Sequence, residues 1–205
     1  MTPAPITALP ASLVEGHLAW RGVGFEQDRE LYARLASEGQ RPPTLLVQCS
    51  DSRVDGVALF GAAPGDLFAV RNVANLVPPA EARDGISAAI AYAVGVLGVG
   101  HIVVLGHSGC GGVAACADLC AGQDLGDPMI TEWVSHLRPA WEGAGAADPV
   151  ALGHEAVRLS LRNLLGYPAV AEAVDRGALV LHGAWIDIAS GTLHAIDDDG
   201  AFAPV

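Results

Sequence analysis

The fold of this 205-residue chain can be inferred outward from the stretch HIVVLGHSGCGG, residues 101–112. Its opening residues, His101–Leu105, are mostly apolar and indicate a short buried strand of a parallel sheet. His107 and Cys110 follow in a glycine-containing turn, and residues 113–117 are typical of a helix. An open α/β sheet carries its chemistry where a strand ends and a helix begins. One histidine and one cysteine cannot hold a metal ion alone, so the rest of the chain is expected to complete the site.

A second predicted strand, Thr44–Gln48, ends directly before Cys49. If the two strands are parallel and near neighbours, Cys49 lies beside His107 and Cys110 at the carboxyl edge of the sheet. Two thiolates and one imidazole make a zinc site, and three protein ligands leave the fourth tetrahedral position open, as in catalytic sites. Water in such a position has a pKa of about 7, so hydroxide exists at neutral pH.

Asp51 and Arg53 follow the same strand end, two residues apart. A guanidinium can hold a carboxylate through two hydrogen bonds and keep it ionised. Two roles are open for Asp51: it orients zinc hydroxide toward an electrophile, or it binds zinc as a fourth ligand in a closed state. Arg53 is expected to determine which role Asp51 takes. While Arg53 holds the Asp51 carboxylate, the fourth position on zinc stays open.

Strands that alternate with helices predict an α/β fold, with helices flanking a central, mainly parallel sheet. Asp84 and Asp148 stand where N-caps of two of the helices are expected. The remaining strands are predicted at residues 67–71 and 178–182, with a final hairpin of 185–189 and 192–196. The main helices are predicted at residues 85–97, 111–120, 128–141, 149–166 and 168–176, with Ile130 and Val150 on inward faces.

Residues 1–39 are predicted to form a helical arm ahead of the first strand. Ser12 and Glu15 have capping-box spacing, which predicts a helix that begins there and runs to about Trp20. A second helix is expected at residues 26–37. The arm has little apolar surface of its own, so it is expected to lie on something else, such as a second subunit. The whole chain, residues 1–205, is predicted to be a single domain with this appendage.

The composition excludes several classes of partner. The net charge is −12 and the chain has only 11 Lys and Arg, which disfavours nucleic acid and anionic membranes. The N-terminus lacks the basic and apolar regions of a signal peptide, and no apolar run is long enough to span a bilayer. A cytoplasmic protein is therefore expected. Its four cysteines are expected to be thiols or metal ligands, not a disulfide framework.

The other cysteines and histidines have less specific patterns. Cys116 and Cys120 lie four apart on a predicted helix, and core packing is favoured over metal binding. His154 falls on an apolar helix stripe and is expected to be a core residue, and His182 is expected to be structural. The remaining histidines outside the zinc set show no ligand spacing and are expected at surface or capping positions: His17, His101, His136 and His194.

Three motifs together resemble the β-class carbonic anhydrases: Cys49–Arg53 (CSDSR), Pro64–Phe68 (PGDLF) with Arg71-Asn72, and Gly106–Gly112 (GHSGCGG). The resemblance is strong over about residues 40–112. It implies one zinc ion per chain, held by Cys49, His107 and Cys110, with Asp51 and Arg53 as the dyad. It implies a carbonate dehydratase, a zinc lyase that reversibly hydrates CO2 to bicarbonate and a proton. It also implies a three-layer fold and a homo-oligomer with a dimer as its minimal unit, often paired into a tetramer, with the N-terminal helix over the partner.

The plant-like branch of this family lines its substrate pocket with a Gln, a Phe, a Val and a Tyr. The matching positions here hold Gln40, Phe68, Val73 and Tyr92, and the glycines after Cys110, including Gly111, are expected to let substrate approach the zinc closely. Because CO2 is small and apolar, the Phe, Val and Tyr side chains suit a slot for it.

The other branch closes its site with the aspartate on zinc and builds a regulatory bicarbonate pocket with a Trp and a Tyr. Leu46 and Ile186 occupy those two positions, so an open resting site without that pocket is expected. Gln48 departs from the family, which usually has a small residue before the first cysteine, and it is expected either to reshape the pocket floor or to bridge to a neighbour.

Two other functions fit the same residues. Carbonyl sulfide and carbon disulfide are linear electrophiles with the shape of CO2, so the motifs also allow a hydrolase of either. A non-catalytic, zinc-binding regulatory subunit is a further alternative, although the pairing of Asp51 with Arg53 argues against it.

Overall fold

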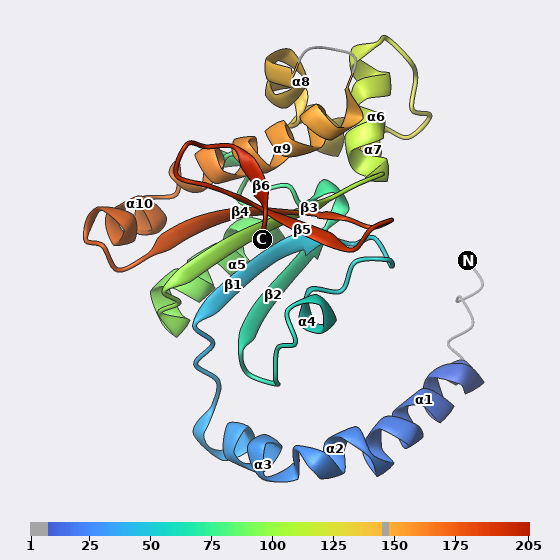
Figure 1. Ribbon diagram of the computed structural model, residues 1–205, viewed down its shortest axis with the longest axis vertical. Coiled ribbons are helices and arrows are strands. Elements are labelled where there is room, and N and C mark those ends of the chain that lie inside the picture. Colours follow the sequence, from blue (N-terminus) through green and yellow to red (C-terminus); the bar gives the residue numbers. More distant parts are fainter. Residues whose placement is uncertain (1–7, 145–147) are drawn as a thin grey trace, which may run out of the picture. The chain divides into compact units, whose positions relative to one another are not determined.

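The computed structural model describes residues 8–144 and 148–205 (Figure 1). The chain divides into two compact units, Met1–Gln40 and Arg41–Val205. The larger unit holds a six-stranded sheet in the order β2-β1-β3-β4-β5-β6. The first four strands in that order are parallel, and β5 and β6 are antiparallel additions. The strands are β1 (Thr44–Cys49), β2 (Leu67–Asn72), β3 (His101–His107), β4 (Val180–Asp187), β5 (Thr192–Ile196) and β6 (Phe202–Pro204).

Helices flank the sheet in the larger unit, which confirms the predicted three-layer α/β fold (Figure 1). Short 3-10 segments follow β2: η1 (Val73–Asn75) and η2 (Ala80–Ala82). The α-helices are α4 (Gly56–Leu59), α5 (Gly85–Tyr92), α6 (Gly111–Cys120), α7 (Pro128–Ser135), α8 (Arg138–Ala144), α9 (Pro149–Leu164) and α10 (Pro168–Asp175).

The core has separate clusters on the two faces of the sheet. On one face, β1 and β3 pack against α5, α9 and α10, and the buried residues include Leu45, Ile102, Ile90, Val157 and Val170. On the other face, Leu46, Leu105 and Ile186 pack with Val54, just ahead of α4. A third cluster joins α6 to α9 at the carboxyl ends of β1 and β3, and it includes Cys110, Cys116, Val134 and Leu152.

The strand order places a switch point between β1 and β3. The chain runs from β1 outward to β2 on one side, and β3 and β4 lie on the other side of β1. In open α/β sheets, ligands bind outside the carboxyl ends of the two strands from which the chain leaves in opposite directions. Cys49 ends β1 and His107 ends β3, so both stand at this point.

The structure corrects the prediction for the last strands. The segments predicted separately at 178–182 and 185–189 form one strand, β4, which is parallel to β3 and antiparallel to β5. Gly183 lies inside it, and a Cβ there would stand 2.3 Å from Cδ1 of Ile196. This glycine therefore makes room for packing and does not mark a turn. β6 was not predicted.

Two predicted helices are not continuous. The segment 128–141 breaks between α7 and α8, because Pro139 lacks an N–H and its ring conflicts with the preceding turn. Ile130 is 48 % exposed and Val150 is 44 % exposed, so the prediction that they face inward was wrong. The segment 85–97 widens from α5 into a π-helical turn, η3 (Ala93–Leu97).

The two predicted N-caps are confirmed. The side chain of Asp84 accepts a hydrogen bond from the N–H of Ser87, and that of Asp148 accepts one from the N–H of Val150.

The N-terminal unit contains α1 (Ala11–Gly22), α2 (Gly24–Gln27) and α3 (Arg29–Glu38). The capping box predicted from Ser12 and Glu15 was wrong, because the helix starts one residue earlier, with Pro10 as N-cap and no side-chain cap. The helix predicted at 26–37 is split at Asp28. None of the residues in these helices is buried.

Within residues 8–144 and 148–205, every helix is too short or too polar to cross a membrane.

Candidate metal centre

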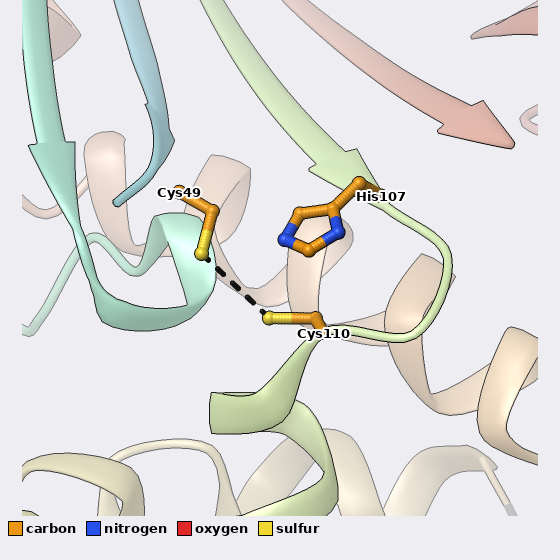
Figure 2. A group of neighbouring side chains, drawn as sticks. All are labelled: Cys49, His107 and Cys110. Atoms are coloured by element: carbon orange, nitrogen blue, oxygen red, sulfur yellow. Dashed lines mark hydrogen bonds between the residues drawn. The ribbon is translucent and has the colours of Figure 1, made fainter. Parts of the chain in front are cut away.

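Three buried side chains converge at the carboxyl ends of β1 and β3. Cys49 is 5 %, His107 2 % and Cys110 6 % exposed. Their donor atoms all lie within 4.8 Å of one another, and the two sulfurs are 3.8 Å apart. Figure 2 shows the sulfurs and the imidazole facing a common space between two strand ends and the start of α6. The structure therefore brings together the three ligands that the sequence predicts.

The orientation of His107 suits a metal ligand. Its Nδ1 donates to the carbonyl oxygen of Ser108 over 3.0 Å, which leaves Nε2 with a free lone pair. Nε2 is buried and has no hydrogen-bond partner among the described residues. A histidine that binds a metal through one ring nitrogen is usually oriented by a hydrogen bond from its other ring nitrogen to a carbonyl or carboxylate. Two thiols and this Nε2 fit zinc, which favours sulfur and imidazole donors in tetrahedral sites.

The two thiols are not equivalent without a metal. The contact with the Cys110 thiol lowers the pKa of Cys49 below its ordinary value, against the opposing effect of burial. The same contact, together with burial, raises the pKa of Cys110 well above its ordinary value. The pair therefore keeps one proton, and a divalent cation would replace it and hold both groups as thiolates.

Asp51 and Arg53 form a tight pair beside this centre. Arg53 donates from Nε to Oδ1 over 2.9 Å and from Nη2 to Oδ2 over 2.7 Å, and its backbone N–H also donates to Oδ1. These contacts hold the pKa of Asp51 well below its usual range. Oδ2 of Asp51 lies 4.0 Å from Nε2 of His107. Arg53 also donates to the carbonyl of Gly109, which ties the pair to the turn between His107 and Cys110.

Arg71 braces the loop that carries Cys49 and Asp51, a role that the sequence did not reveal. Its guanidinium donates to three carbonyl oxygens, those of Cys49 at 3.2 Å, Asp51 at 2.9 Å and Val54 at 2.8 Å. The only signal in the sequence was its place in the Arg71-Asn72 motif. Asn72 braces the next loop, where its side chain donates to the carbonyl of Leu76 and accepts from the Leu76 N–H.

Ser108 was also missed by the sequence interpretation. Its carbonyl orients His107, and its hydroxyl donates to Asp187 at the end of β4 over 2.9 Å. The hydroxyl also accepts from the N–H of Ile188. These contacts exist because β4 is the neighbour of β3, and no local pattern in the sequence indicates that pairing.

Val73 and Gly111 lie close to the centre, and their part in substrate binding stays a prediction. Val73 follows β2, is 46 % exposed, and its Cγ1 would stand 2.6 Å from a Cβ on Gly112. Trp133 donates to the carbonyl of Val73 over 2.9 Å and fixes this segment. Gly111 begins α6 directly after Cys110.

Phe68 and Tyr92 lie at the other end of the sheet. Their rings are 5.8 Å apart, and Tyr92 is 46 % exposed. Phe68 is in register with Leu45, four residues before Cys49, which is a distance of about 13 Å along a strand. Within a single chain, the rings of Phe68 and Tyr92 therefore do not reach the metal ligands of that chain. Gln40 belongs to the N-terminal unit, and its place in the pocket stays a prediction.

Gln48 lies on the opposite face of the sheet from Cys49, since neighbouring residues of a strand alternate. It is buried, and its Oε1 accepts from the N–H of Gly56 over 2.8 Å. Of the two expected roles, the bridge to a neighbour is the one observed. Leu46 and Ile186 are buried in the apolar cluster on the same face.

The remaining thiols and His154 lie outside the centre. Cys116 is fully buried and Cys120 is half-buried in the cluster around α6. Among the described residues, only Cys49, His107 and Cys110 form a group of three potential metal ligands. His154 stacks on Phe202, with ring centroids 4.0 Å apart.

A mainly parallel α/β sheet with a buried two-cysteine, one-histidine centre at its switch point is typical of a zinc protein, and three protein ligands leave a fourth coordination position open. Residues 44–193 match the family model described as carbonic anhydrase. A carbonic anhydrase of Pseudomonas aeruginosa is 38 % identical, over 90 % of this chain and 86 % of that protein. The chain belongs to the carbonic anhydrase family, in its β class.

Solved structures agree with this assignment. The β-carbonic anhydrase CcaA is 33 % identical and superposes with a TM-score of 0.87, covering 95 % of this chain and 98 % of that one. A structure from a study of two tetrameric β-carbonic anhydrases of Sordaria macrospora is 29 % identical, with a TM-score of 0.78, covering 94 % and 97 %.

Proposed function

We propose that this protein hydrates CO2 reversibly to bicarbonate and a proton, with one zinc ion per chain held by Cys49, His107 and Cys110. The observation that carries this function is the convergence of three buried donors, with Nε2 of His107 left for a metal. When bound, zinc lowers the pKa of water to about 7 and so supplies a nucleophile at neutral pH. The related carbonic anhydrases support CO2 as the substrate and disfavour carbonyl sulfide, carbon disulfide and a purely regulatory role.

Asp51 orients the nucleophile. Its carboxylate lies beside the metal ligands, with Oδ2 4.0 Å from Nε2 of His107, and would accept a hydrogen bond from a nucleophile held there. Arg53 holds both carboxylate oxygens, so Asp51 stays ionised and away from the position of a fourth ligand. The resting site is therefore open, as in the plant-like branch.

The substrate pocket is completed by a second copy of the chain. Val73 and Gly111 come from the subunit that holds the zinc, and Phe68 and Tyr92 come from its partner. β2 is an edge strand, and a twofold axis beside it would run two copies of β2 in opposite directions. The beginning of one β2, with Phe68, would then lie beside the end of the other. A homodimer is thus the minimal active unit, and tetramers form by pairing dimers.

The N-terminal arm supports the same assembly. In α1, the side chains of Leu13, Leu18 and Trp20 are exposed, and none of its residues is buried, so the prediction that the arm has little apolar surface was wrong. Apolar side chains of this kind are stabilised when they lie on another surface. A second copy provides that surface.

The test is zinc analysis together with stopped-flow CO2 hydration. The purified protein is expected to contain one zinc per chain and to hydrate CO2. Cys49→Ser loses zinc and activity, whereas Asp51→Ala keeps zinc and loses roughly 100-fold in kcat/KM, because the nucleophile is no longer oriented. Cys120→Ser, which removes a thiol outside the centre, serves as the control and keeps both. A zinc-loaded protein that is inactive at pH 8 would overturn the proposed function.

A further inference from the structure

Two histidines meet on the sheet far from the metal centre. His101 begins β3, and His182 lies in β4 opposite Val103. Residues two apart in a strand project from one face, so His101, Val103 and His182 share a face. Nδ1 of His101 and Nε2 of His182 are 3.1 Å apart. Both residues are exposed, and His101 precedes His107 by six residues, about 20 Å along the strand.

The separation of the two nitrogens matches a chelate. Metal–nitrogen bonds to histidine are about 2.05 Å long, so two nitrogens 3.1 Å apart subtend about 100° at a shared ion. That angle lies between those of square-planar and tetrahedral coordination. Without a metal, the same contact is a hydrogen bond in which one imidazole donates its proton to the other. An ion that replaces this proton requires the imidazoles to turn until both lone pairs point at the ion, roughly 40° away from the line between the two nitrogens, and both side chains are exposed.

We propose that His101 and His182 form a second metal site, a two-imidazole chelate for a divalent ion such as Cu²⁺, Ni²⁺ or Zn²⁺. Imidazole nitrogens suit these ions, whereas Mg²⁺ and Ca²⁺ prefer oxygen. Burial, and then the charge of His101, lower the pKa of His182, which keeps that ring available as a neutral ligand. The net charge of −12 favours the approach of cations.

The proposed site binds its ion more weakly than the zinc centre, and its ion takes no part in the reaction. Among the described residues no third histidine, cysteine or acidic group joins the pair, so water fills the remaining positions. Such an ion is exchangeable, and it is separate from the zinc that the reaction requires. Protein prepared with excess zinc would then contain more than one zinc per chain, with the surplus removed first by a weak chelator.

The test uses the zinc-loaded full-length protein and the Cu²⁺–nitrilotriacetate complex, which leaves two coordination positions free. Electron paramagnetic resonance is expected to show one complex per chain, bound through two imidazole nitrogens. His101→Ala and His182→Ala each weaken this binding at least tenfold, since a single imidazole remains. His136→Ala removes a histidine elsewhere on the molecule and leaves binding unchanged. The zinc of the centre and CO2 hydration stay unchanged in all three variants, which separates this result from the proposed function.

Three results would overturn the second site. The first is equal uptake of the copper complex by the wild type and by His182→Ala. The second is a wild-type signal from only one imidazole nitrogen. The third is copper that enters only as zinc leaves, since it would then occupy Cys49, His107 and Cys110.

Discussion

At the scale of single residues, Gly112 allows the metal centre to pack closely. A Cβ at this position would stand 2.6 Å from Cγ1 of Val73 and 2.9 Å from Cβ of Ala74. Ala74 has little freedom to move, because its φ of 69° is already in the left-handed region. We expect Gly112→Ala to lower the free energy of unfolding by roughly 1–3 kcal/mol through overpacking, measured by urea denaturation.

The neighbouring glycine provides a matched control for that substitution. A Cβ on Gly111 would meet nothing within 4 Å. Gly111→Ala is therefore expected to change the free energy of unfolding by less than about 0.5 kcal/mol. Alanine has a higher helix propensity than glycine, so propensity cannot explain a loss, and equal losses in the two variants would contradict overpacking against Val73 and Ala74.

Arg71 is expected to act by positioning the loop of the centre. A lysine keeps the charge but cannot donate to the carbonyls of Cys49, Asp51 and Val54 at once. We expect Arg71→Lys to lower kcat/KM by about tenfold while zinc content stays the same, as for other residues that support metal ligands indirectly. CO2 hydration and metal analysis check this. The control is Arg41→Lys, at an exposed site ahead of β1, and similar losses in both variants would contradict the positioning role.

At the scale of secondary structure, capping can be tested at α5. Asp84 accepts from the N–H of Ser87 over 2.9 Å and also from its hydroxyl. We expect Asp84→Ala to cost about 1 kcal/mol of stability. In a protein of this size such a loss lowers Tm by about 2–4 °C, which calorimetry can detect. Asp28 is the N-cap of α3, but its side chain makes no capping hydrogen bond, so Asp28→Ala should change stability little. A larger loss of stability in Asp28→Ala than in Asp84→Ala would contradict the capping explanation.

The elements that the sequence predicted correctly are those with local causes. β1 and β3 are short apolar runs, and Asp84 and Asp148 cap through their own neighbours. The break between α7 and α8 also has a local cause, Pro139, but the error at β4 has a distant one. Nothing local shows that Ile196 fills the space above Gly183, inside the strand that was predicted as two segments.

The metal ligands could be predicted for a general reason. Cys49 and His107 each end a parallel strand, and such ends share one edge of the sheet. The place of Phe68 and Tyr92 could not be predicted, since it depends on β2 being an edge strand. The same limit applies to Ser108, whose partner Asp187 is known only once β4 is placed beside β3.

At the scale of the whole molecule, a pocket shared between subunits can be tested by mixing inactive variants. Cys49→Ser lacks zinc but keeps its pocket rings, and Tyr92→Ala keeps zinc but lacks a ring. A mixed dimer would regain one complete site. After unfolding and refolding of an equal mixture, we expect about a quarter of wild-type activity, because half of the dimers are mixed and each has one intact site.

A second mixture controls for that recovery. Cys49→Ser and Asp51→Ala both damage the half of the site that one chain supplies, so no mixed dimer contains an intact site. This mixture should therefore stay inactive. If the first mixture stays as inactive as the second, the pocket is not shared between subunits.

The position of the metal ligands along the chain also determines the order of events in folding. His107 and Cys110 lie within one turn, but Cys49 is 61 residues away from Cys110, and it arrives only when β1 pairs with β3. A zinc ion therefore finds all three ligands only after β1 has paired with β3. In the mature protein, separation of these two strands would release the ion, so the rate at which a strong chelator removes zinc sets an upper limit on how often β1 and β3 separate.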